Sequence, residues 1–247
     1  MFVVAFTLGW FITKRIFINE NLSLEKLDSL FIYMVIAILL GARLGHVLFY
    51  QSDLILKDPI SVLLPFRTVP EFEYTGFQGL ASHGAAIGVI IAMFIYSKKV
   101  LKKPVLWILD RVVIAVASGA IFVRIGNFIN SEIIGKATNS DFGVIFKQLG
   151  EDFPRHPAQL YESFGYIFVF LILWFVYWKT EKRNQRGFLF GLFLVLLFTV
   201  RFFVEFVKEA QVDERAEWAL NTGQLLSIPL VLTGLYFIFT SSKKLHD

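Results

Sequence analysis

Residues 105 to 123 read V-L-W-I-L-D-R-V-V-I-A-V-A-S-G-A-I-F-V, and this stretch decides the class of fold. A bilayer core about 30 Å thick needs roughly 20 apolar residues per helix, and here only Asp110 and Arg111 are charged. The rest of the 247-residue chain is similar, with 56% hydrophobic, 17% aromatic and only 18% charged residues. This apolar share exceeds that of an ordinary soluble domain. The sequence therefore predicts an integral membrane protein.

Apolar stretches bounded by charge extend on both sides of this segment. They predict an all-α integral membrane protein with about seven transmembrane helices, and the absence of internal repeats or linker composition predicts a single transmembrane domain over 1–247. No basic residue precedes the first stretch, so we interpret it as a retained helix and not as a signal peptide. The sixth can continue as a helix through Arg201 and Glu205 to Val207. The predicted spans are 1–13, 31–50, 80–97, 105–123, 162–178, 187–200 and 223–240.

The loops between these spans alternate in charge, which predicts their orientation. The short loops 14–30, 98–104, 179–186 and 241–247 hold 13 Lys or Arg in 39 positions. The long loops 51–79, 124–161 and 201–222 hold only 9 in 89 positions. The positive-inside rule places the short loops in the cytoplasm, so we expect the N-terminus outside, the C-terminus cytoplasmic and the long loops at the outer face. The basic pI is thus a sign of topology, and no nucleic-acid partner is expected.

Polar residues concentrate near the outer ends of the predicted helices. A charge at a helix centre costs roughly 2.5 to 3.5 kcal/mol on insertion scales, so each one needs a reason. If the fourth helix continues, Arg124 and Asn127 share a face, and Arg201 and Glu205 form a second such face. Arg binds phosphate bidentately, so two Arg-plus-Glu sites favour a site for an anionic headgroup. The alternative is that each Arg and Glu form a structural ion pair.

The histidines do not predict a metal site. His83, in L-A-S-H-G-A-A-I-G, begins the third span beside Gly84, where a lipid or peptide could approach its imidazole closely. His46 lies among apolar neighbours, and we interpret it as a packing residue. The four histidines lack metal-ligand spacing, and the chain has no cysteine, which excludes a thiolate metal site and a covalent mechanism on a thiol of its own.

Six ordered blocks resemble one known family, the prolipoprotein diacylglyceryl transferases of bacterial inner membranes. The most characteristic is V-R-I-G-N-F-I-N-S-E-I-I-G at 123–135, which matches the family pattern except that Val123 replaces a usual glycine. The others are G-A-R-L-G-H-V-L-F-Y at 41–50, G-F-Q-G-L-A-S-H-G-A-A-I-G at 76–88, R-H-P-A-Q-L-Y-E at 155–162, R-F-F-V-E-F at 201–206 and G-Q-L-L-S-I-P at 223–229.

Two departures from the family accompany these blocks. Family members usually carry a short tyrosine-containing stretch before the first span, whereas this chain begins with Met1-Phe2-Val3, which indicates a truncated or misassigned start. Leu197 stands where the family commonly has a tyrosine in the sixth span. We therefore expect that the role of this tyrosine is dispensable or is met elsewhere.

The resemblance implies transfer of the diacylglyceryl group of phosphatidylglycerol to the lipobox cysteine thiol of a prolipoprotein, with release of glycerol phosphate. Its implied partners are phosphatidylglycerol, the prolipoprotein signal peptide with its lipobox cysteine, and the lipid bilayer. The implied location is the bacterial inner (cytoplasmic) membrane, as a multi-pass protein. No metal or soluble cofactor is required. The alternative is a membrane transporter or channel for a small anion or lipid, with Arg124 and Arg201 as its binding ring.

The same resemblance assigns residue roles. His83 is the expected base for the thiol, with Glu132 as the alternative. Arg124 and Arg201 would bind the phosphate, and Glu132 and Glu205 would orient these arginines. The remaining substrate-binding positions would be Asn127, Asn130, Gly135, Arg43 and Gly84, of which the two asparagines would hydrogen-bond the headgroup or the peptide backbone.

Overall fold

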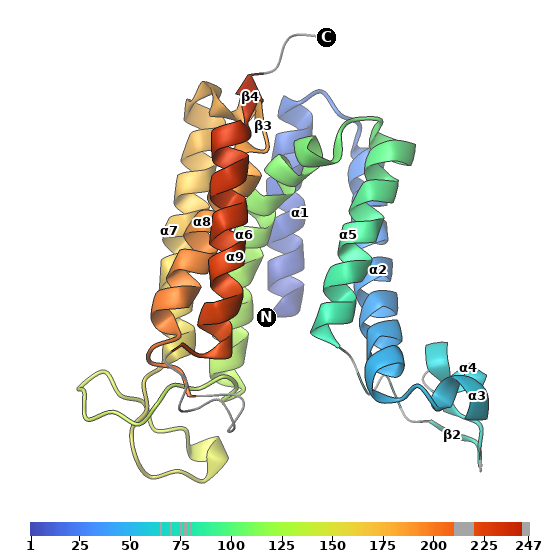
Figure 1. Ribbon diagram of the computed structural model, residues 1–247, viewed down its shortest axis with the longest axis vertical. Coiled ribbons are helices and arrows are strands. Elements are labelled where there is room, and N and C mark those ends of the chain that lie inside the picture. Colours follow the sequence, from blue (N-terminus) through green and yellow to red (C-terminus); the bar gives the residue numbers. More distant parts are fainter. Residues whose placement is uncertain are drawn as a thin grey trace. The chain divides into compact units, whose positions relative to one another are not determined.

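The chain is almost entirely helical in the computed structural model, which describes residues 1–64, 66–69, 71–74, 76, 79, 81–209 and 220–243 (Figure 1). The long helices are α1 (Phe2–Asn19), α2 (Leu24–Tyr50), α5 (Ser82–Tyr96, extended by a π-helical turn over Ser97–Leu101), α6 (Val105–Ile129), α7 (Ala158–Lys179), α8 (Phe188–Val204) and α9 (Thr222–Thr240). The short elements are α3 (Leu54–Lys57), α4 (Pro59–Leu63), the 3₁₀ turns Lys147–Leu149 and Glu181–Asn184, and the strands β1 (Phe66–Arg67), β2 (Glu73–Tyr74), β3 (Gln185–Arg186) and β4 (Ser242–Lys243).

The prediction of an all-α integral membrane protein is confirmed in its class. Within the described residues, six helices are long and apolar enough to cross a membrane: α1, α2, α5 with its π turn, α6, α7 and α9. The remaining apolar helix, α8, has 17 residues and falls short of that length. The count of seven spans and the orientation of the termini stay predictions.

Several predicted boundaries were wrong because a helix does not end where the first charge appears. Helix α1 continues through Lys14 and Arg15 to Asn19, because long basic side chains can lie along aromatic rings while the helix goes on. Helix α6 likewise carries Arg124 and ends only at Ile129. Helix α8 ends at Val204, short of the predicted Val207. The predicted outer loops 124–161 and 201–222 therefore begin later, and residues 210–219 of the second lie outside the described residues.

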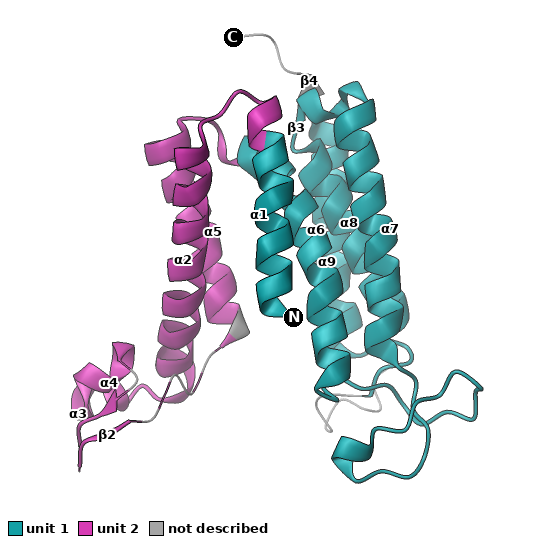
Figure 2. Cartoon of the chain, turned by 180° about the vertical axis from the view of Figure 1, so that it is seen from behind, with its two compact units in different colours: residues 1–16, 106–247 teal, residues 17–105 magenta. Residues whose placement is uncertain are grey.

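The chain forms two compact units, which are coloured separately in Figure 2. Unit 1 comprises Met1–Ile16 and Leu106–Asp247, and unit 2 comprises Phe17–Val105. The predicted single domain over 1–247 stays a prediction. The core of unit 1 is built from α1, α6, α7 and α8, with the fully buried residues Ile16, Ile114, Ala117, Leu173, Tyr177 and Leu189 at its centre.

A buried carboxylate joins α6 to the start of α8 in unit 1. Asp110, which is 0% exposed, accepts hydrogen bonds from the backbone N–H of Gly187 at 2.7 Å and of Phe190 at 2.9 Å. The first N–H groups of a helix have no partner within the helix, and here a distant side chain supplies one. This contact explains why a charge is tolerated inside the predicted fourth span.

Helices α2 and α5 of unit 2 meet backbone to backbone. Gly41 and Gly45 of α2 face Gly84 and Gly88 of α5, so that a Cβ added to Gly84 would collide with the carbonyl of Gly41 and the Cα of Gly45. Small residues spaced four apart allow such close packing in membranes, where dispersion contacts and not the hydrophobic effect hold helices together. Gly84 is therefore required by packing.

A hydrogen-bond network organises the segment after α2, which was predicted as the loop 51–79. Asp58 accepts from the backbone N–H and hydroxyl of Thr68 at 2.7 and 2.6 Å and from the Ser61 hydroxyl. These hydrogen bonds from Ser61 and Thr68 hold the pKa of the Asp58 carboxyl well below its usual range. Arg43 donates from Nε to the carbonyl of Val62 at 3.0 Å and also reaches the carbonyl of Ser61, so it anchors this segment to α2.

Candidate active site

One cluster of polar residues in unit 1 lies at the end of the bundle where α6 ends and α7 begins. Arg124, on the last turns of α6, places Nε 2.7 Å from Oε2 of Glu162, a carboxylate with 0% exposure. The N–H does not point at this oxygen, so the contact is an ion pair without an aligned hydrogen bond. Arg124 also donates from Nη1 to Oδ1 of Asn127 at 3.2 Å, which confirms that these two residues share a helix face.

Lys208 connects two buried carboxylates. Its Nζ donates to Glu162 Oε1 at 2.9 Å and to Glu205 Oε2 at 3.0 Å. Lys208 is 3% exposed and Glu205 is 7% exposed, so this chain of charges is shielded from solvent. Buried charges are tolerated only when paired in this way.

Backbone pairing between two loops fixes the position of Lys208. Gly135 and Lys208 form an antiparallel bridge, flanked by hydrogen bonds from the N–H of Lys136 to the carbonyl of Val207 and from the N–H of Glu209 to the carbonyl of Ile134. A Cβ at Gly135 would collide with the carbonyl of His156. Gly135 is therefore needed for close approach of three loop segments beside the charged network.

Arg201 differs from its neighbours because its charge is not compensated. Within the described residues it makes no ion pair, and its buried Nε donates to no acceptor. Arg201 lies near Tyr166, and so do Arg124 and Glu162. A buried N–H donor without an acceptor is unfavourable, so this Nε is available to an incoming acceptor.

A second chain of hydrogen bonds leads from Arg124 toward the exposed surface. Asn127 Nδ2 donates to Glu132 Oε2 at 2.8 Å, and Asn130 Nδ2 donates to Glu132 Oε1 at 3.3 Å. Gln159 of α7 donates from Nε2 to the Glu132 carbonyl at 2.5 Å, while its buried Oε1 has no partner within the described residues. Glu132 is exposed and remains open to a substrate.

Within the described residues, neither arginine forms an ion pair with the acid that was expected to orient it, and Glu132 is linked to Arg124 through Asn127. The carboxylate beside Arg124 belongs to Glu162 and not to Glu132, because α7 begins beside the end of α6 and presents Glu162 directly. Glu205 pairs with Lys208 and not with Arg201, because the helix ends at Val204 and the chain then folds Lys208 back onto Glu205. Sequence reasoning assigned no role to Glu162, Lys208 and Gln159. Glu162 and Gln159 lie in the block at 155–162 that carried the resemblance.

His83, His46 and Arg43 belong to unit 2. The exposed ring of His83, at the start of α5, packs edge to face against Phe49 at 5.0 Å and lies 5.9 Å from the ring of Tyr50. His46 packs against Tyr50 and against the backbone of Gly79, as a packing residue should. Arg43 is held by the carbonyls described above. The described residues contain no group of three His, Asp or Glu arranged for a metal ion.

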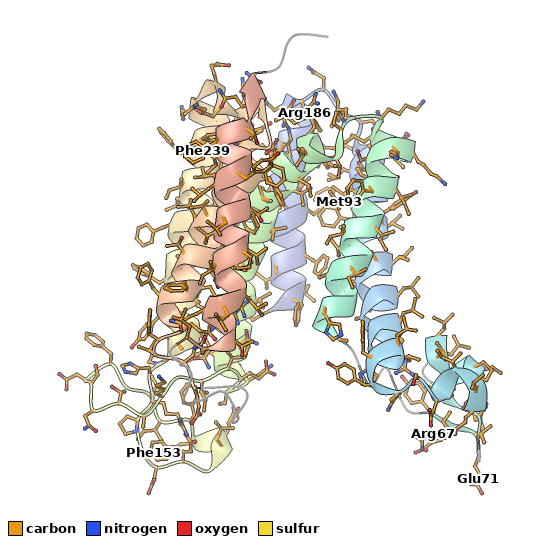
Figure 3. All side chains as sticks on the ribbon, viewed as in Figure 1. Arg67, Glu71, Met93, Phe153, Arg186 and Phe239 are labelled. Carbon is orange, nitrogen blue, oxygen red and sulfur yellow. The ribbon has the colours of Figure 1, made fainter. Side chains whose placement is uncertain are left out.

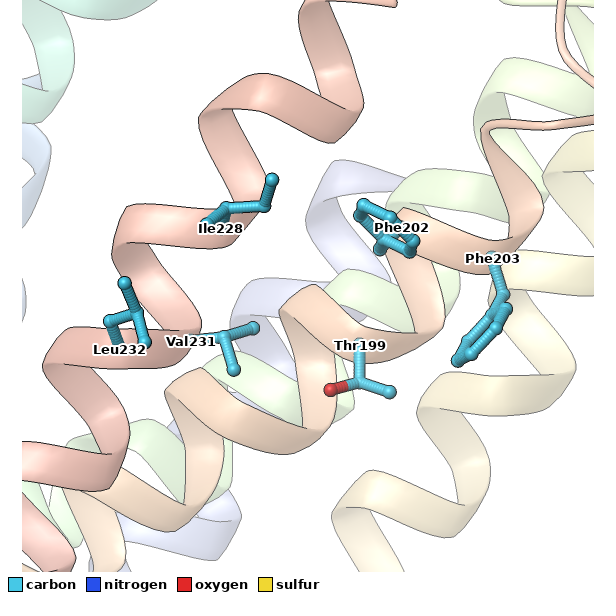
Figure 4. A pocket seen from close by; sticks show the side chains of 6 residues that line it. All are labelled: Thr199, Phe202, Phe203, Ile228, Val231 and Leu232. Carbon is cyan, nitrogen blue, oxygen red and sulfur yellow. The ribbon is translucent and has the colours of Figure 1, made fainter. Parts of the chain in front are cut away.

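An apolar groove of about 240 Å³ lies between α8 and α9 (Figure 4). It is lined by Thr199, Phe202, Phe203, Ile228, Val231 and Leu232. It contains no charged side chain, so its walls suit hydrocarbon and carry no chemistry of their own.

Apolar helices and a cluster of paired cations and carboxylates at one end of unit 1 define a membrane protein with a charged cluster at that end. The family model described as prolipoprotein diacylglyceryl transferase matches residues 1–240. The chain is 43% identical to the phosphatidylglycerol–prolipoprotein diacylglyceryl transferase of Bacteroides fragilis, over 92% of this chain and 82% of the relative. It is 39% identical to that of Tolumonas auensis, over 99% and 90%. The chain therefore belongs to the prolipoprotein diacylglyceryl transferase family.

Proposed function

We propose that this chain transfers the diacylglyceryl group of phosphatidylglycerol to the lipobox cysteine thiol of bacterial prolipoproteins. Membership of the family supports a transferase with these two substrates. The observation that carries the proposal for this site is the guanidinium of Arg201, which is partly buried and has an unused Nε donor near Arg124, because two guanidinium groups suit the phosphate that leaves with glycerol. The transporter alternative has no comparable support.

The reaction forms one bond and breaks another. The thiolate sulfur bonds to the glycerol carbon that carries the phosphate, the carbon–oxygen bond to phosphate breaks, and glycerol phosphate leaves. Arg201 would receive the phosphate oxygens through its unused donor, and Arg124 would add a second cation. Glu162 and Lys208 would hold Arg124 in place, since Glu162 is fixed by Lys208 on its other oxygen. Asn127 and Asn130 would keep Glu132 oriented toward the substrate.

The cysteine thiol needs a base, because its ordinary pKa is about 8.5. His83 is the first candidate and Glu132 the second. Glu132 is connected to Arg124 through hydrogen bonds with Asn127. The imidazole of His83 is exposed and packs against two aromatic rings. Both side chains are exposed, so each is accessible to a substrate.

The proposal includes the way in which the chain lies in the membrane. Seven spans, with α8 as the shortest, would place the N-terminus outside, the C-terminus in the cytoplasm and the charged cluster at the outer face of the inner membrane. The unequal distribution of Lys and Arg between loops supports this orientation. The lipobox cysteine would then meet the site from the outer side.

The function is tested by incubating the purified protein with phosphatidylglycerol and a lipobox peptide. We expect a peptide heavier by one diacylglyceryl group and an equal amount of glycerol phosphate, both measured by mass spectrometry. A peptide with serine in place of cysteine is the control and should stay unmodified. Transport of phosphatidylglycerol or a small anion without a thioether product would contradict the proposal.

The two candidate bases are separated by their pH profiles. If His83 is the base, His83→Gln should lose most transfer near neutral pH and recover part of it as the pH rises toward about 8.5, because more of the thiol is then ionised. Glu132→Gln is the matched comparison and should show no such recovery. The opposite pattern, or loss of phosphatidylglycerol binding by folded His83→Gln, would make Glu132 the base.

A further inference from the structure

Unit 1 has a second polar region at the end opposite its charged cluster, where α7 ends and β3 pairs with β4. In Figure 3, Arg186 labels this end and Phe153 labels the loop at the other end of the same unit. Among the described side chains at this end that are at least partly exposed, six are basic and one, Glu181, is acidic; Glu181 accepts a hydrogen bond from Asn184. The six are Lys14, Arg15, Lys179, Lys182, Arg183 and Arg186. Such an excess attracts anionic headgroups.

Arg15 is held in a defined orientation at this end. Its guanidinium lies 5.3 Å from the ring centre of Trp174 and 5.1 Å from that of Trp178. The two indoles are one helical turn apart on α7, and their centres are 5.5 Å apart. Stacking occupies the faces of a guanidinium and leaves its in-plane N–H groups available. Within the described residues, these N–H groups donate to no acceptor and pair with no carboxylate.

Trp178 supplies a second unused donor at the same place. Its Nε1 is buried and has no hydrogen-bond partner within the described residues. A buried indole N–H nearly always has an acceptor, so an orphaned one indicates that something is bound there. The acceptor must lie beside Arg15, because the guanidinium is only 5.1 Å from the centre of this ring.

We propose that Arg15 and Trp178 form a binding site for the headgroup of an anionic phospholipid, separate from the active site. The phosphate oxygens would accept from the in-plane fork of Arg15 and from the indole N–H of Trp178. Tryptophan rings prefer the depth of the membrane–water interface, where the phosphates of lipids lie. A phospholipid is favoured over free phosphate because both donors belong to α1 and α7, two apolar helices whose other side chains suit acyl chains.

The test uses the intact protein in nanodiscs of phosphatidylcholine with a minority of phosphatidylserine, followed by native mass spectrometry to count the retained phosphatidylserine. Arg15→Gln should reduce retention about tenfold, because a bidentate charge-assisted contact is lost. Trp178→Phe keeps a ring but removes the N–H, and it should reduce retention less. Arg183→Gln is the matched control, since it removes one charge from the same end, and it should retain the lipid. Transferase activity should be unchanged in Arg15→Gln.

Three results would overturn the proposal. Equal loss in Arg15→Gln and Arg183→Gln would show a diffuse basic surface without a site. Equal retention of phosphatidylserine by wild type and both site variants would show that these donors hold no lipid. Displacement of phosphatidylserine by inorganic phosphate would identify a free anion as the ligand. The melting temperature of each variant is measured to check that it is folded. If Arg15→Gln does not fold, Trp178→Phe still tests the site.

Discussion

Arg124 and Arg201 are both partly buried arginines near one carboxylate network, yet their surroundings differ. Arg124 is held by Glu162 and Asn127, whereas Arg201 has an orphaned Nε. Arg124 is thus fixed in position, and Arg201 lacks an ion-pair partner in the described part of the chain. Together they leave an excess of positive charge in a place that is shielded from solvent. We therefore predict that an anion entering this place is bound more strongly than it would be in water.

Arg124→Lys tests whether the shape of the guanidinium matters as well as its charge. Lysine keeps the charge but loses the planar fork, so we expect transfer to fall on the order of 100-fold while the protein stays folded. The measurement is kcat/KM with a lipobox peptide. Arg67→Lys, on exposed β1, is the control and should have no effect. Wild-type turnover by a stable Arg124→Lys protein would remove Arg124 from a bidentate role.

At the level of residues, the structure brings several of the predicted side chains together, but their ion-pair partners differ from those expected. Arg124, Asn127, Asn130 and Glu132 do form one connected group, because a continued helix and the turn after it bring near neighbours together. Glu162 and Lys208 are 46 positions apart and meet only through packing of α7 against the end of α8. No spacing rule indicates such a contact, so the ion pairs could not be derived from one sequence.

Among the elements, the helix ends differ most between the prediction from sequence and the structure. Apolar length located each long helix, but the first charge did not mark its end, as Arg15 in α1 and Arg124 in α6 show. The aromatic rings beside Arg15 and the carboxylate beside Arg124 offset the cost of these charges. The position of such a helix end depends on neighbouring helices, so it cannot be predicted from the sequence of one segment alone.

Asp110→Asn tests the capping contact between α6 and α8. The amide keeps one acceptor oxygen but turns an NH₂ group toward one of the two backbone N–H donors, so one of them loses its partner. We expect the free energy of unfolding in detergent to fall by about 1 to 3 kcal/mol. Asp141→Asn, in an exposed loop, is the matched control. Equal stability of the two variants would show that the buried contact contributes nothing.

The whole molecule carries its basic residues unequally along the chain, and this asymmetry predicts a single orientation. A reporter that is active only outside the cytoplasm should be active when fused after Gly150 and silent when fused after Lys102. Fusions would be scored by reporter activity per amount of protein. The reverse pattern would place the charged cluster of unit 1 on the cytoplasmic side and exclude contact with an externally presented lipobox.

The backbone contact between α2 and α5 also has a genetic consequence. Gly41, Gly45, Gly84 and Gly88 leave no space for a single added carbon. Every single-base change that alters a glycine codon introduces a residue with a Cβ or creates a stop codon. At these four positions, only silent base changes are therefore neutral. Amino-acid substitutions in unit 2 must therefore accumulate on the outward faces of α2 and α5, while the glycines at which the two helices touch stay unchanged.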